Sequence, residues 1–181
     1  MSLQDLSLIN FKHYSQLGLE LSPKINCFTG PNGVGKTNLL DAIYYLSMCK
    51  SYLNPIDSQN IKHDQDFFVI QGNYLRKDKK EQIYCGLKRN KKKQFKRNKK
   101  EYQKLSDHIG LLPIVMISPT DNSLILEGSE ERRKFMDSVI SQYDKKYLDQ
   151  LIRYNRALAQ RNKLLKEFYQ NRSFNEESLD I

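Results

Sequence analysis

The residues best suited to chemistry are the eight from Gly30 to Thr37, which fit the phosphate-binding pattern G-x-x-x-x-G-K-[ST] without a mismatch. Glycines in such a loop let the backbone adopt positive φ, so that successive N–H groups point at an anion. Lys36 is then expected to reach the β- and γ-phosphates, and the Thr37 hydroxyl to bind Mg²⁺. The candidate nucleotide ligands are Gly30, Pro31, Asn32, Gly33, Val34, Gly35, Lys36 and Thr37.

The segments on either side of this loop have the order that a phosphate site needs. Residues 24–29 are short and mostly apolar and predict a strand. Residues 36–49 have apolar positions with a helical period and predict a helix whose N-terminus faces the phosphates. The alternative is a glycine-rich turn before an ordinary helix. Strand, loop and helix in register favour a nucleoside triphosphate site over that alternative.

Other apolar patterns indicate an α/β fold with more strands near the N-terminus. Strands are expected at 3–11, 17–21, 66–75 and 82–87, with a short strand or extended loop at 91–97 and a strand buried on both faces at 111–117. Helices are expected after a cap at Ser129 and over about 145–170. The second helix has a seam at steps of three and four residues, which fits a coiled coil or a plain amphipathic helix. We therefore expect a nucleotide-binding lobe over 1–120 and the beginning of a helical lobe over 121–181.

The positive charge of the chain is concentrated in one segment. The net charge is +9, yet residues 76–104 hold fourteen Lys or Arg against three Asp or Glu, so the remainder is slightly negative. Such a run can neutralise phosphates and bind nucleic acid without reading its sequence, although charge runs are often simply solvated. The candidate nucleic-acid contacts are Lys88, Arg89, Lys91, Lys92, Lys93, Lys96 and Arg97.

Composition indicates the cellular compartment in which the protein is expected. The chain has no apolar run long enough to span a membrane, and its N-terminus lacks the features of a signal peptide. Cys27, Cys49 and Cys85 are widely spaced, which favours buried free thiols in a reducing cytoplasm over a disulfide framework or a zinc site.

Hydrolysis needs an acidic residue at the end of an apolar strand, to complete the Mg²⁺ site and to position water. The strand expected at 111–117 is followed by Ser118 and Pro119, and Asp121 comes too late. No other apolar strand ends in an acidic pair. The sequence therefore predicts nucleotide binding without a complete catalytic apparatus, and the catalytic residues stay unassigned.

Five stretches resemble a known family. Residues 8–14 and 25–46 are similar to the start of the ATPase head of SMC-type proteins. Within that group, residues 118–121, 128–137 and 154–165 resemble the RecF family of bacterial DNA replication and repair proteins. The resemblance covers nearly the whole chain and is loosest over 76–104.

The resemblance implies an ABC-type ATPase head that binds ATP with Mg²⁺ and forms an ATP-dependent homodimer on DNA, single-stranded or gapped. It also implies a slow ATPase in the intact protein, RecO and RecR as partners, and a role in recombinational repair and the SOS response. Lys12 matches the family's basic residue after the first strand, which helps to hold nucleotide; its alternative is an ordinary surface lysine. The family's signature motif and second acidic motif are missing, so we expect an N-terminal piece of a longer protein.

Two other classes fit parts of the sequence. A small P-loop kinase or nucleotidase would explain the loop, but it would need an acidic partner and a lid within this length. A nucleotide-regulated RNA-binding protein would explain the basic segment, but not the motifs between 118 and 165.

Overall fold

The structure is a computed structural model, and it describes residues 1–118 and 128–172. The chain divides into two compact units, Met1–Met116 and Ile117–Ile181. Pro119, Thr120 and Asp121, on which part of the RecF resemblance rests, lie outside the described residues.

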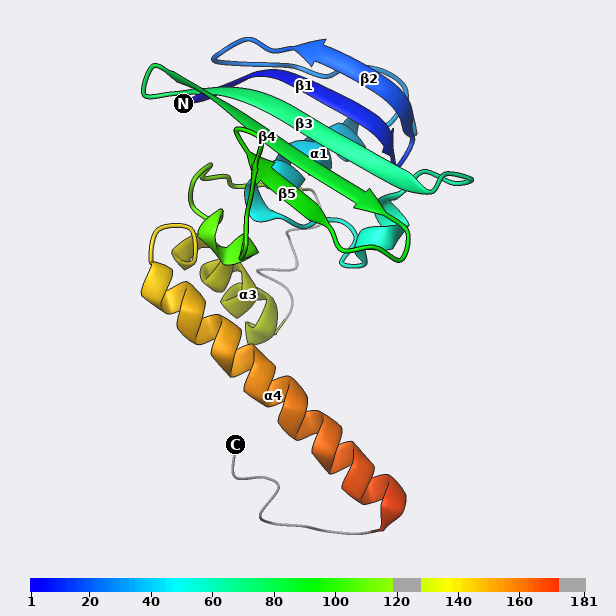
Figure 1. The fold of residues 1–181 in the computed structure, drawn as a ribbon, viewed down its shortest axis with the longest axis vertical. Coiled ribbons are helices and arrows are strands. Elements are labelled where there is room, and N and C mark those ends of the chain that lie inside the picture. The colour runs from blue at the N-terminus through cyan, green and yellow to red at the C-terminus, as the bar shows by residue number, and fades with distance from the viewer. Residues whose placement is uncertain (119–127, 173–181) are drawn as a thin grey trace. The chain divides into compact units, whose positions relative to one another are not determined.

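The first unit is built on a six-stranded antiparallel sheet in the order β2-β1-β3-β4-β5-β6 (Figure 1). Its strands are β1 (Ser2–Phe11), β2 (Tyr14–Glu20), β3 (Phe67–Arg76), β4 (Lys79–Lys88), β5 (Gln94–Arg97) and β6 (Lys100–Glu101). Alternation along these strands sends one set of side chains into the core and the other to the opposite face. The strands predicted at 3–11, 17–21, 66–75 and 82–87 are confirmed, with small differences at their ends. The segment 91–97, predicted to be a short strand or an extended loop, contains the short strand β5.

Helix α1 (Lys36–Met48) packs against the inner face of the sheet and confirms the helix predicted after the loop (Figure 1). Tyr45 lies at the centre of this core, where its ring makes edge-to-face contacts with Phe11 and Phe68. All three side chains are fully buried. Such rings supply large apolar areas, so this contact fixes the helix, and with it the loop, against the sheet.

Two predicted strands are absent. Residues 24–29 and 111–117 are irregular, and neither segment joins the six-stranded sheet. Ile25 is 84% exposed and Ile117 is 80% exposed, so these apolar side chains have no neighbouring strands to bury them. A strand exists only through its pairing partners, and the described part of the chain provides none for these two segments. Cys27, predicted to be buried, is exposed for the same reason.

Two 3₁₀ turns complete the first unit, η1 (Asp57–Asn60) and η2 (Leu105–Asp107). After η2, His108 is fully buried, and its Nε2 lies 2.7 Å from the carbonyl oxygen of Leu46 on α1. This contact ties the end of the unit back to the helix.

The second unit contains α3 (Ser129–Ile140) and α4 (Lys145–Asn171), both close to the predicted helices. Gly128 occupies the cap of α3, so Ser129 is the first helical residue and not the cap. Asp144 caps α4 by accepting a hydrogen bond from the backbone N–H of Tyr147 at 3.0 Å.

Candidate nucleotide site and nucleic-acid surface

The glycine loop has the backbone that the sequence predicts. Gly30, Gly33 and Gly35 have φ of 149°, 85° and 105°, values that residues with a Cβ rarely adopt. Gly35 is also the N-cap of α1, and because it has no side chain it leaves the helix N-terminus uncapped. The first turn contains no acidic residue. The first N–H groups of α1 and its partial positive charge are therefore available to an anion.

Lys36 folds back over this loop. Its Nζ donates to the carbonyl oxygens of Gly30 and Pro31, both at 2.8 Å. These contacts hold the ammonium at the mouth of the loop, within reach of any phosphate that binds there. Across the loop, the Tyr14 hydroxyl donates to the Gly35 carbonyl at 3.1 Å, which connects the β2 strand to the start of α1.

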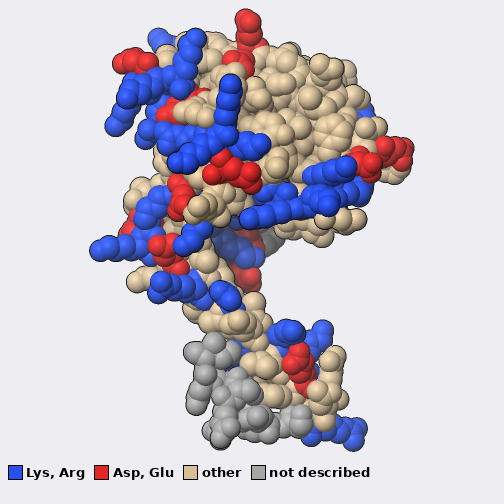
Figure 2. Space-filling view, in the orientation of Figure 1, with Lys and Arg blue, Asp and Glu red and all other residues tan. Residues whose placement is uncertain are grey.

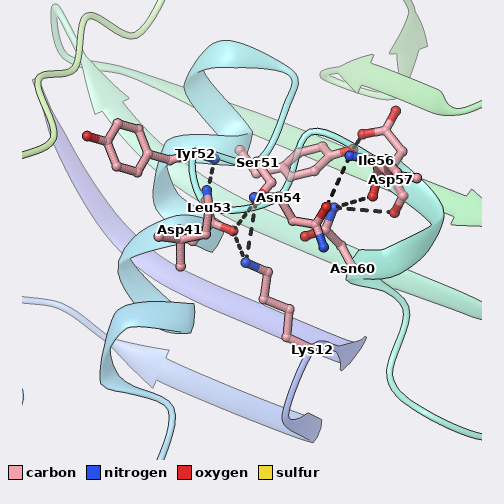
Figure 3. Close-up of polar contacts among 10 residues, drawn as sticks. Lys12, Asp41, Ser51, Tyr52, Leu53, Asn54, Ile56, Asp57 and Asn60 are labelled. Carbon is pink, nitrogen blue, oxygen red and sulfur yellow. Dashed lines mark hydrogen bonds and ion pairs between the residues drawn. The ribbon is translucent and has the colours of Figure 1, made fainter. Parts of the chain in front are cut away.

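Lys12 is held by a buried carboxylate that the sequence reasoning missed. Its Nζ lies 2.5 Å from Oδ2 of Asp41, whose side chain is fully buried on α1 (Figure 3). The Asp41 carboxylate also accepts hydrogen bonds from the Ser51 hydroxyl and the Tyr52 backbone N–H, each at 2.6 Å. This network attaches the end of β1 and the segment after α1 to one point on the helix. The sequence contains one signal of this buried carboxylate, because Asp41 is the single acidic residue in the otherwise apolar stretch 39–46.

A polar cleft lies beside Lys12. It reaches the first turn of α1 at Asn38, the residue after Thr37, and so adjoins the phosphate loop. Its lining residues are Lys12, Asn38, Leu53, Asn54, Ser58, Gln59, Ile61, His63 and Arg89. The structure therefore places Lys12 next to the loop's helix, although its charge is already balanced by Asp41.

The lysines and arginines of the predicted nucleic-acid segment differ in their surroundings. Lys93 is only 11% exposed, and its Nζ donates to Asp57 and to the Cys49 carbonyl, each at 2.7 Å, and to the Tyr45 hydroxyl at 3.1 Å. Burial, together with the neighbouring Asp57, raises the pKa of Tyr45 well above its usual range. Lys93 therefore joins α1 to η1, and its side chain is not available to a nucleic acid.

Other cations of the segment are partly engaged. Arg97 pairs with Glu81 through two hydrogen bonds, of 2.8 and 2.5 Å. This hydrogen bonding to Arg97 lowers the pKa of Glu81. Arg89 donates to the Gln65 carbonyl at 3.2 Å, and the Lys96 Nζ lies 5.4 Å from the centre of the Tyr84 ring.

The three remaining candidates are exposed: Lys88, Lys91 and Lys92. They belong to the end of β4 and the turn that leads to β5, whereas Lys77 and Lys99 belong to turns at the other ends of the strands and Lys100 begins β6. Figure 2 shows basic side chains gathered in separate areas with a mainly neutral face between them. One basic segment of sequence thus becomes two basic surfaces.

The described residues offer no ready-made metal centre. Residues 1–118 and 128–172 contain no group of three or more His, Cys, Asp or Glu side chains that could hold a metal ion. Within the same ranges, no helix has both the length and the apolarity needed to cross a membrane.

A glycine loop that leads into an uncapped helix, with a lysine folded over the loop, is the phosphate-binding arrangement of P-loop ATPases. The model of the AAA domain family matches residues 5–180. The chain therefore belongs to the AAA domain family.

Individual relatives show a more specific similarity than the family model does. The chain is 66% identical over 167 residues to the DNA replication and repair protein RecF of Bacteroides fragilis, and covers 45% of that protein. It is 56% identical over all 181 residues to RecF of Flavobacterium johnsoniae, and covers 50% of it. A solved structure of the recombination mediator protein RecF with ATP matches 98% of the chain at 34% identity and a TM-score of 0.87, with 48% of that structure covered.

These findings confirm the resemblance to RecF and the expected fold class. An SMC ATPase structure shares the fold at 17% identity and a TM-score of 0.63. The chain spans about half the length of the curated relatives that it matches.

Proposed function

We propose that this chain is the nucleotide-binding part of a RecF-type protein of DNA replication, recombinational repair and the SOS response, and that it binds ATP with Mg²⁺ at Gly30–Thr37. The observation that carries the proposal is the positive φ of three glycines in a loop that ends at an uncapped helix. The relatives named RecF, and the RecF structure solved with ATP, support ATP as the nucleotide.

The backbone N–H groups and the Lys36 side chain contact different parts of a bound triphosphate. The N–H groups of the loop and of the first turn of α1 donate to phosphate oxygens. Lys36 exchanges the carbonyls of Gly30 and Pro31 for the β- and γ-phosphates, because an ionic partner holds an ammonium more strongly than a neutral carbonyl does. The net binding free energy from Lys36 is therefore the difference between the phosphate contacts that it forms and the carbonyl contacts that it gives up.

Thr37 is the residue that would hold Mg²⁺, through its side-chain hydroxyl. An oxygen ligand from the protein combined with phosphate oxygens and water suits this ion. When bound, the ion would neutralise part of the negative charge of the phosphates. Lys12, beside Asn38 and already balanced by Asp41, would orient the nucleotide by hydrogen bonding and add no net charge.

DNA is the second ligand in this proposal, in single-stranded or gapped form and in the cytoplasm. The exposed lysines at the β4–β5 turn, Lys88, Lys91 and Lys92, supply charge for its phosphates. The proposal includes dimerisation driven by ATP and partnership with RecO and RecR, and the likeness to RecF supports both. Size-exclusion chromatography of the full-length protein with and without ATP tests the dimer, and co-elution with RecO and RecR tests the partners.

Calorimetry with ATP and Mg²⁺ tests the nucleotide site. Lys36→Ala is expected to weaken ATP binding by at least tenfold, since one charge-assisted phosphate contact is worth about 1.5–3 kcal/mol. Lys50→Ala, which removes an exposed lysine outside the loop, is the matched control and should bind like the parent. Equal affinity of Lys36→Ala and the parent would refute the assignment of the loop. Phosphoryl transfer to a small acceptor without any DNA binding would favour a kinase or nucleotidase, and preference for RNA over DNA an RNA-binding protein.

A further inference from the structure

A shallow groove runs across the outer face of the sheet, on the side opposite α1. Register places Phe67 opposite Lys88 and Val69 opposite Gly86, and alternation puts these residues and Tyr84 on the same face. The groove has a volume of about 500 Å³ and is lined, among others, by Phe67, Tyr84, Gly86, Lys88, Lys91 and Lys92. None of its lining residues is acidic.

The floor of this groove is aromatic because Gly86 has no side chain. A Cβ at Gly86 would lie 2.6 Å from the Tyr84 hydroxyl oxygen and 3.0 Å from the ring carbon that bears it. The Tyr84 ring therefore lies along its own strand, over the Gly86 backbone, and does not stand up from the sheet. Beside it, Phe67 is 41% exposed. Two aromatic side chains thus lie on the same face of the sheet, Phe67 exposed and Tyr84 half-buried.

Positive charge borders this aromatic surface. Lys88, Lys91 and Lys92 are exposed at its edge, and the Lys96 ammonium lies over the Tyr84 ring. Tyr84 and Lys96 are both half-buried, and a cation–π contact of this kind contributes about 0.5–2 kcal/mol. A base stacked on an aromatic ring contributes about 1–3 kcal/mol, so a flat ligand can replace Lys96 on the ring. Lys96 would then be released to pair with an anion on that ligand. The groove therefore fits a ligand that combines a flat ring with nearby negative charge.

We propose that this groove, the Tyr84 groove, binds an unpaired nucleotide of DNA, whose base stacks on Tyr84 or Phe67 while the lysines contact its flanking phosphates. Base stacking on aromatic side chains beside a cationic track is a general means of holding single strands. Within a duplex each base is covered by its neighbours, so only an unpaired or splayed base can use these rings. The inference rests on the proposed DNA-binding function and adds which DNA form this surface selects.

The test measures how tightly the full-length protein binds fluorescent oligo(dT) and a duplex of equal length. Comparing the two affinities separates the contribution of base stacking from that of charge. Tyr84→Ala is expected to weaken oligo(dT) binding by about five- to 150-fold, the equivalent of about 1–3 kcal/mol for one stacked base. Gly86→Ala should act in the same direction, because its Cβ displaces the Tyr84 ring while every charge remains. Neither change should alter duplex affinity or the slope of affinity against salt.

Matched controls complete the experiment. Tyr84→Phe keeps the ring and should bind as the parent does, and Gln71→Ala, beside Tyr84 on the same face, should also leave binding unchanged. The double variant Lys91→Ala with Lys92→Ala should instead reduce the salt slope for both DNA forms. Thermal melting of each variant establishes that it is folded.

Two outcomes would overturn the inference: unchanged oligo(dT) affinity in folded Tyr84→Ala, or equal losses for oligo(dT) and duplex. Failure of the parent to bind any DNA would count against the proposed function as well. A parent that binds DNA together with variants that bind equally well would count against the Tyr84 groove alone. ATP affinity, which Tyr84→Ala should not change, keeps the nucleotide site separate from both.

Discussion

The phosphate loop and the basic segment are both conspicuous in the sequence, yet they relate differently to the structure. In the loop, Gly30, Gly33 and Gly35 adopt the backbone that their residue type permits, and Lys36 sits at its mouth. In the basic segment, lysines that look equivalent have different roles: Lys93, 11% exposed, forms an ion pair with Asp57, whereas Lys91 and Lys92 are exposed. Local backbone geometry can be predicted from residue type, but the surroundings of a long side chain depend on distant residues.

The Asp41 network gives the largest expected effect. Asp41→Ala should destabilise the protein by about 3–5 kcal/mol, because it leaves Lys12 unpaired beside buried groups and removes acceptors from Ser51 and Tyr52. Urea unfolding measures the change. Glu20→Ala, at an exposed acidic residue, is the control and should remain within about 0.5 kcal/mol of the parent. Equal stability of the two variants would remove Asp41 as the anchor of Lys12.

Alanine substitutions of Lys93 and Lys92 test most directly whether lysines of the basic segment have different roles. Lys93→Ala should cost about 2–3 kcal/mol, since its partner Asp57 is 36% exposed and can regain part of its hydration. Lys92→Ala should stay within about 0.5 kcal/mol. If both substitutions had the same effect on unfolding and on DNA binding, the segment would behave as uniform charge and the contrast with the loop would fail.

The conformation of Gly33 can be tested against Gly18. A Cβ at either position meets nothing within 4 Å, but only Gly33 has positive φ, at 85°. Gly33→Ala should therefore cost about 1–2 kcal/mol and weaken ATP binding, while Gly18→Ala should be close to neutral. Thermal unfolding and calorimetry with ATP provide the two readouts. Tolerance of alanine at Gly33 in both would mean that the loop does not depend on this backbone conformation.

The pair between Glu81 and Arg97 gives the smallest effect, and its sign depends on pH. The pKa of Glu81 is lowered in the folded protein, so its stabilisation is complete above the unfolded-state pKa and is lost as pH falls through the folded-state pKa. At neutral pH, Glu81→Gln should cost about 1 kcal/mol, a value reduced because Arg97 is 39% exposed. Unfolding measured from neutral pH to about pH 3 should show this difference shrinking on acidification. A difference that grows towards low pH would contradict the stated direction.

The two regions also show where prediction from sequence succeeded and where it could not. Alternation identified β1, β3 and β4, because period-two burial is a property of any strand with one face on a core. The same apolar signal misassigned 24–29 and 111–117, since a strand also needs partners to pair with. Asp57 and Asp41 could not be matched to Lys93 and Lys12, because their separations in sequence carry no information about distance in space.

By itself, the sequence determined the phosphate loop, the helix that follows it and the likeness to RecF, because these depend on residue type at fixed spacing. Tertiary structure alone decided that Lys12 and Lys93 are balanced by buried or half-buried carboxylates. It also decided that Phe67 and Tyr84 share one face beside Lys88. The physical reason is the same in each case: pairing, burial and register arise only when strands and helices distant in sequence are brought together.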